Sequence, residues 1–74
     1  MDVDHINAEL RAAEVKLSDL KRAFDRGVHR NELIVAAQQT IDMLGRLRGE
    51  ARKFEVPIGR LLDKYERLMV RLLN

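Results

Sequence analysis

The sequence predicts an all-α protein: an antiparallel, coiled-coil-like helical hairpin and a shorter third helix, forming a three-helix bundle. Apolar residues recur at alternating spacings of three and four, which is the period of one helix face. Gly27 and Pro57 divide this pattern into three segments. A short connection joins the first two, so they should fold back on each other. We expect one domain over residues 1–74, with helices at about 2–26, 31–55 and 57–73.

The first predicted helix carries the most regular apolar stripe. Its members are Val3, Ile6, Leu10, Ala13, Leu17, Leu20 and Phe24. Asp2 or Asp4 suits the start of the helix, where the backbone dipole favours a negative charge. Gly27 follows a basic last turn and is typical of the glycine that ends a helix in the left-handed conformation.

The second predicted helix should begin after Asn31, a residue that favours the N-cap position. Its stripe consists of Leu33, Ala37, Thr40, Leu44, Leu47, Ala51 and Phe54, and Ile34, Ile41 and Met43 widen it. In an antiparallel hairpin Phe24 would lie near Leu33, and the pairing would continue outward until Val3 lies near Phe54. Gly45 and Gly49 would offer another helix a close approach, or would be tolerated on a solvent face.

The third predicted helix begins at Pro57, because proline suits a first helical turn. One stripe comprises Ile58, Leu61, Tyr65, Leu68 and Leu72, and a second beside it comprises Leu62, Met69 and Leu73. This apolar arc is wider than docking on a two-helix hairpin requires. The sequence therefore leaves two interpretations: both stripes pack inside the monomer, or part of the arc contacts a second chain.

Size and composition limit the classes of function. A domain of 74 residues without cysteine has no disulfide and a small core, so we expect extra stability to come from good helix packing or from a partner chain. The longest apolar run, "LIVAA" at residues 33–37, is too short to span a bilayer, and no signal peptide is visible. We therefore expect a cytoplasmic protein. The third helix contains no Trp or Phe, which argues against a helix that lies on a membrane surface.

Two polar clusters resemble chemical sites. Asp25, His29 and Glu32 lie around the first connection, but a hairpin tip offers no water-excluding pocket, so we interpret them as connector residues. We expect no catalytic residues, and therefore no enzyme.

A second cluster has the spacing of helical metal ligands. Asp2, His5 and Glu9 would share one helix face, but no second His and no Cys accompanies them. We expect no metal site and no cofactor.

The function that the sequence favours is a protein-interaction or assembly module, such as a small subunit, adaptor or chaperone-like partner. The predicted partner-binding residues are Leu61, Leu62, Tyr65, Leu68, Met69, Leu72 and Leu73. The partner would be an identical copy, making a homo-oligomer, or another helical protein.

The alternative is a small dimeric regulator that binds nucleic-acid phosphates through an arginine-rich face of the second and third helices. Residues 46–74 carry eight bases and four acids, a net charge of +4. Arg60, Lys64, Arg67 and Arg71 line one side of the third helix and are the predicted phosphate-binding residues. Asp63 and Glu66 are interleaved with these bases, and aromatic residues for base stacking are scarce, so the sequence favours the protein partner.

Overall fold

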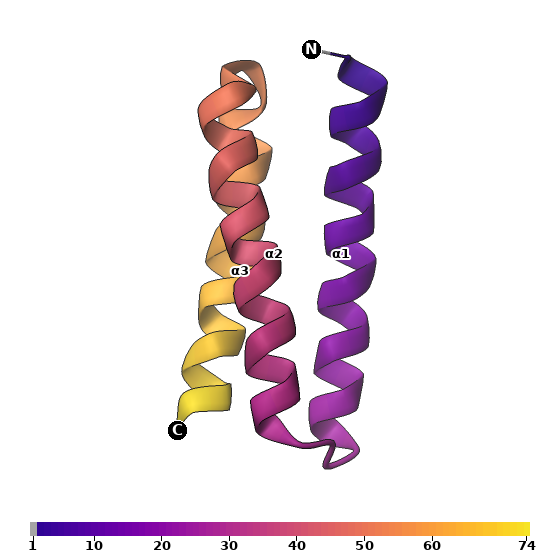
Figure 1. Ribbon diagram of the computed structural model, residues 1–74, viewed down its shortest axis with the longest axis vertical. Coiled ribbons are helices and arrows are strands. Elements are labelled where there is room, and N and C mark those ends of the chain that lie inside the picture. The colour runs from indigo at the N-terminus through magenta and orange to yellow at the C-terminus, as the bar shows by residue number, and fades with distance from the viewer. Residues whose placement is uncertain (1) are drawn as a thin grey trace.

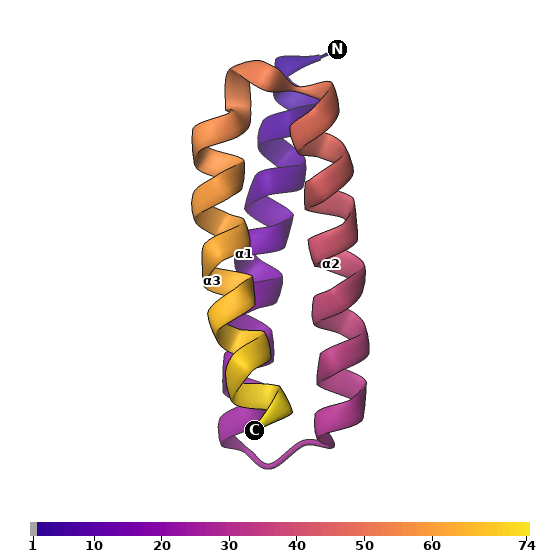
Figure 2. The ribbon, with the colours of Figure 1, turned by 90° about the vertical axis from the view of Figure 1, so that its left-hand side faces the viewer.

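Three long helices make up the computed structural model, which describes residues 2–74 and contains no strand within them. Helix α1 spans Val3–Asp25, α2 spans Arg30–Glu50 and α3 spans Glu55–Leu73. Figure 1 and Figure 2 show α2 running opposite to α1 and α3. The predicted all-α bundle, with a hairpin and a shorter third helix, is confirmed.

The end of α1 has the predicted glycine geometry. Gly27 has a φ of 83°, in the left-handed region that favours glycine. Its N–H donates to the carbonyl of Phe24 at 3.1 Å, and the N–H of Val28 donates to that of Ala23 at 3.0 Å. These two bonds form a Schellman motif, which satisfies carbonyls at the helix end. At the other end of α1 the Asp2 carboxylate accepts from the N–H of Asp4 at 3.1 Å and caps the helix.

The bounds of α2 and α3 differ from the predicted ones. The N-cap of α2 is His29, without a side-chain bond, so Asn31 lies inside the first turn instead of capping it. The chain leaves α2 at Ala51, with a φ of −118° and a ψ of 71°, and makes a short 3-10 turn over Arg52–Phe54. Pro57 still lies in the first turn of α3, where a missing N–H costs nothing.

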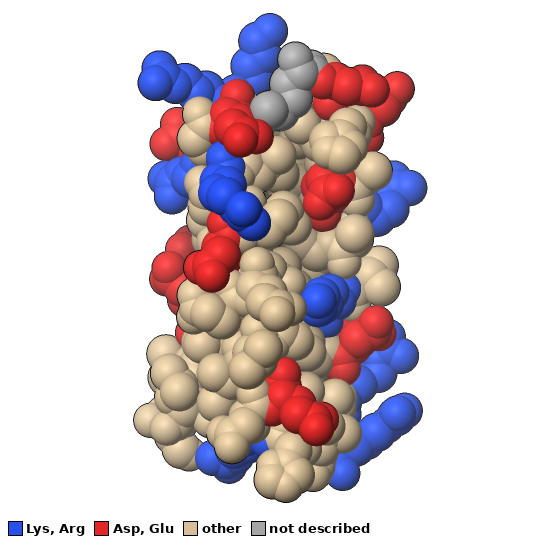
Figure 3. Space-filling model, viewed as in Figure 1, with Lys and Arg blue, Asp and Glu red and all other residues tan. Residues whose placement is uncertain are grey.

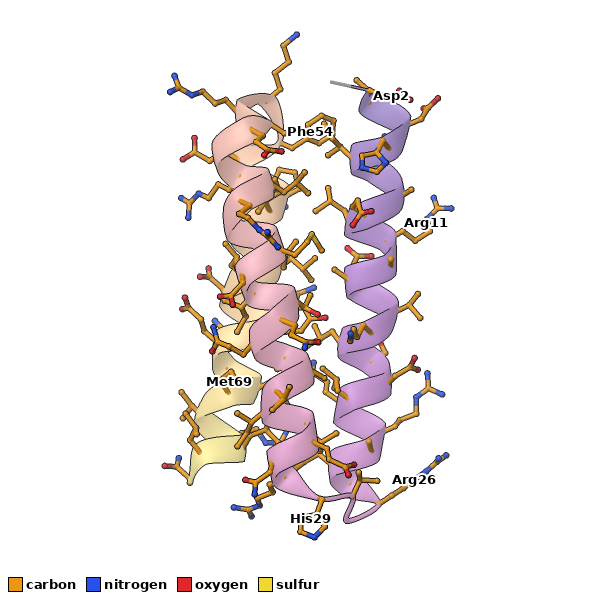
Figure 4. All side chains as sticks on the ribbon, in the orientation of Figure 1. Asp2, Arg11, Arg26, His29, Phe54 and Met69 are labelled. Atoms are coloured by element: carbon orange, nitrogen blue, oxygen red, sulfur yellow. The ribbon has the colours of Figure 1, made fainter. Side chains whose placement is uncertain are left out.

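The core follows the predicted stripes. Its buried apolar residues are Ile6, Ala13, Leu17, Leu20, Leu33, Ala37, Leu44, Leu47, Ala51, Ile58, Leu61, Tyr65, Leu68 and Leu72. Leu10, Phe24 and Phe54 of these stripes are half-buried at the edge of the core, and Val3 is 53% exposed in the first turn of α1. Phe54 reaches from the second bend toward the first turns of α1 (Figure 4), as the predicted pairing of the two ends requires.

One buried hydrogen bond connects α3 to α1 across the core. The Tyr65 hydroxyl donates to the main-chain oxygen of Ala13 at 2.6 Å, and the Tyr65 side chain is fully buried. Burial raises the pKa of Tyr65, and the nearby Thr40 hydroxyl partly opposes this rise. The Thr40 hydroxyl itself donates to the carbonyl of Ala36 at 3.2 Å. Both buried hydroxyl groups therefore have partners, as a low-polarity core requires.

The hairpin turn and the end of α3 meet at the same pole of the bundle. Arg30 Nη1 donates to the main-chain oxygen of Asn74 at 2.8 Å. The guanidinium carbons of Arg30 and Arg71 lie 5.6 and 5.0 Å from the centroid of the Phe24 ring, within the range of cation–π attraction. The stretch around the turn thus anchors the last turn of α3.

No helix within residues 2–74 combines the length and the apolar character that crossing a membrane demands.

Candidate functional site

The predicted partner-binding residues of α3 fall into two groups. Leu61, Tyr65, Leu68 and Leu72 are at most 3% exposed and belong to the core of the single chain. They are unavailable to a partner while the bundle is folded, because α1 and α2 already cover them. The accessible members are Leu62, Met69 and Leu73.

These accessible residues continue onto α2. Leu62 and Met69 are half-buried, as are Ile34 and Ile41 of α2, whereas Leu73 is 67% exposed. We name these five residues the α2–α3 strip. Ile41 and Leu62 line one shallow groove together, and Figure 4 shows Met69 farther down α3, toward the pole where that helix ends.

The α2–α3 strip lies in a weakly charged part of the surface. Figure 3 shows few Lys, Arg, Asp or Glu side chains at its lower left, where α2 begins and α3 ends. Two further apolar residues, Val35 and Val70, are each more than half exposed in these same helices. Scattered exposed valines are ordinary, but a strip that crosses two helices is typical of an interaction surface.

The predicted phosphate-binding residues are divided by the fold. Lys64, Arg67 and Arg71 line a groove between α1 and α3, whereas Arg60 is outside that lining. The basic residues of α2 lie elsewhere: Arg46 lines grooves on both sides of α2, and Arg48 pairs with Glu55 at 3.4 Å. The bases of α2 and α3 thus occupy separate grooves.

The hairpin cluster has no shared pocket. Asp25 ends α1, Glu32 lies in the first turn of α2, and both are exposed. His29 lines a small hollow with Phe24, Gly27 and other turn residues, but neither acid lines it. Figure 4 shows His29 pointing out from the foot of the bundle. This geometry does not assemble an acid, a base and an enclosed substrate space.

The N-terminal cluster is also dispersed. Asp2 is engaged in capping α1, and His5 Nε2 lies 3.9 Å from Glu9 Oε1. Within residues 2–74 no three His, Cys, Asp or Glu side chains gather as ligands for a metal ion.

Two features were missed by the sequence analysis. Lys21 of α1 joins Lys64, Arg67 and Arg71 in the α1–α3 groove. The signal was present, because Lys21 follows Leu17 of the stripe by one helical turn and so flanks the face that α3 covers. Phe24 also serves as a platform for Arg71, a contact that requires knowing where α3 ends.

No protein-family model matches the sequence, and neither the curated proteins nor the solved structures gave a match.

Proposed function

We propose that the protein is a helical interaction module that associates with another helical chain through the α2–α3 strip. The observation that carries this proposal is the strip itself. Leu73 is 67% exposed, and the half-buried residues beside it extend the apolar surface across two helices. Burying a leucine side chain is worth about 1.5–3 kcal/mol, so covering this strip would add appreciable stability to a small domain.

A helix laid along the strip is the occupant that its shape favours. Leu62, Met69 and Leu73 share one face of α3 at i, i+7 and i+11, and Ile34 and Ile41 repeat at i, i+7 on α2. Two antiparallel ridges of this spacing receive the apolar face of a helix. The simplest partner is a second copy of the chain, and a different helical protein is the other form of the same proposal.

Site-specific photo-cross-linking tests both forms at once. A photoreactive amino acid replaces Leu73 in one variant and Val56 in a second, within the cell that makes the protein. Val56 is the matched control, because it is 64% exposed on the same helix but lies at the opposite end. The proposal expects a discrete protein adduct from position 73 and none from position 56. Equal labelling at the two positions overturns it.

Light scattering over a concentration series then identifies the partner type. A mass that rises with concentration, and falls back to the monomer in Leu73→Gln but not in Val56→Gln, indicates self-association through the strip. A monomeric mass throughout, with a cross-linked adduct of another protein, indicates a different partner.

A further inference from the structure

The groove between α1 and α3 brings four basic side chains together in one lining. It has a volume of about 500 Å³ and is lined by Lys21 of α1 and by Lys64, Arg67 and Arg71 of α3. We call these four residues the basic groove. They lie on the flank of α3 that faces away from the α2–α3 strip, so the two surfaces are separate.

The positive charge of the basic groove is largely uncompensated. Glu14 is the one acid in the lining, so four bases and one acid leave a net charge of +3. None of the four bases belongs to an ion pair within residues 2–74. Four neighbouring cations with one acid among them repel one another, and an anionic ligand would reduce that repulsion.

One of these cations is held in place. The Arg71 guanidinium carbon lies 5.0 Å from the centroid of the Phe24 ring. Cation–π attraction limits the rotamers of a side chain that otherwise loses much entropy on binding. Arg71 is therefore preorganised at the end of the groove, where it can face a carboxylate with little further ordering.

The shape of the groove favours a helix as its occupant. Lys64, Arg67 and Arg71 are spaced at i, i+3 and i+7, which covers about 10 Å along α3. A second helix laid alongside presents acidic residues at the same spacing. Leu17, Leu61 and Leu68 in the lining are at most 5% exposed, so the aliphatic stems of the lysines and arginines supply the apolar contact for that helix.

We infer that the basic groove binds an acidic amphipathic helix of a partner protein. Two observations favour this occupant over a nucleic-acid strand. Glu14 lies in the lining, where it would repel a uniformly charged phosphate chain but can face a basic residue of a mixed-charge helix. The lining also contains no aromatic residue on which a base could stack.

A synthetic peptide provides the test. The probe is a labelled helix of about 15 residues with Leu on one face, Glu flanking it and one Lys placed to face Glu14, long enough to retain some helicity. Its counterpart carries Gln in place of each Glu. The full-length protein should bind the Glu peptide, measured by fluorescence anisotropy, and the Gln peptide should bind at least tenfold more weakly. Added salt should weaken the binding of the Glu peptide.

Two double variants separate the groove from general charge attraction. Lys64→Gln with Arg67→Gln should weaken binding of the Glu peptide about tenfold, because it removes two of the ion pairs that the inference assigns to the groove. Arg52→Gln with Lys53→Gln changes the net charge equally, at exposed positions of the 3-10 turn at the opposite pole. This control should bind like the wild type, and circular dichroism should show equal helicity in both variants.

Each other outcome overturns the inference. If the Glu peptide does not bind at low salt, the groove is not a site for an acidic helix. If peptide binding weakens equally in both double variants, the attraction is only non-specific. Tighter binding of a single-stranded oligonucleotide of the same charge, lost in the Lys64/Arg67 variant, assigns the groove to phosphates instead. The Leu73→Gln variant should bind the peptide like the wild type, so failure of the α2–α3 strip and failure of the basic groove are distinguishable.

Discussion

Replacing Tyr65 by Phe should lower the free energy of unfolding by about 1 kcal/mol. The change removes the hydroxyl that donates to the main-chain oxygen of Ala13 at 2.6 Å and retains the fully buried ring. The Ala13 carbonyl lies inside α1 and still accepts from the N–H four residues later. The acceptor therefore keeps one partner, so the loss is that of an ordinary hydrogen bond and smaller than the roughly 3 kcal/mol of a fully orphaned buried group.

Thermal unfolding followed by circular dichroism measures this effect. For a domain of 60–100 residues, 1 kcal/mol corresponds to a fall in Tm of about 4–8 °C. Ser18→Ala is the control, because it removes an exposed hydroxyl from α1 and should change the free energy of unfolding by no more than about 0.5 kcal/mol. If Tyr65→Phe melts like the wild type, the hydroxyl contributes nothing net and the argument from the buried bond is refuted.

Three further predictions concern the same fold. Burial raises the pKa of Tyr65 above 10.0, so the folded state resists ionisation of this side chain. Its contribution to the free energy of unfolding is complete below pH 10.0 and should be lost as pH rises from there through the folded-state pKa. Urea unfolding over a pH series should show this loss in the wild type and not in Tyr65→Phe. Gly27→Ala should lower the free energy of unfolding by about 1–2 kcal/mol, because the position has a φ of 83°. Gly45→Ala should raise it by up to about 1 kcal/mol, because the added Cβ meets no atom within 4 Å. Urea midpoints that shift in the same direction in the two variants contradict this pair of predictions. Leu44→Ala should cost about 2–5 kcal/mol, because Leu44 is fully buried, and a small change in calorimetric Tm would mean that the core closes around the gap.

The sequence predicted the helices because its apolar period and its breakers agree. Ala13, Leu17 and Leu20 repeat at the spacing that a buried face needs, and Gly27 takes the left-handed conformation at the turn without the steric cost of a Cβ atom. The second bend was harder to place. Phe54 continues the stripe of α2, so periodicity extends that helix past Ala51, where the backbone in fact turns. A short bend leaves no gap in the pattern, because Ala51 before it and the half-buried Phe54 within it pack against the same core.

The interaction surfaces were predictable only in part. The second stripe of α3 identified Leu62, Met69 and Leu73, but sequence spacing cannot separate them from Leu61, Tyr65, Leu68 and Leu72 until the sides covered by α1 and α2 are known. The same limitation hid Lys21, whose importance depends on α1 running beside α3 in the same direction (Figure 1, Figure 2). Periodicity describes a single helix, whereas a groove belongs to two.

The opposite placement of Asp2 and Asn74 has a mechanical consequence. The bundle is 38 Å long, and the two ends of the described chain lie at its opposite poles (Figure 1). A force pulling the ends apart would slide α1 and α3 past each other along their axes. Such shear loads the Tyr65–Ala13 bond and the core layers together, whereas peeling would break them one after another. Pulled in this direction, the bundle should yield in a single step at a higher force than when its ends are pulled sideways.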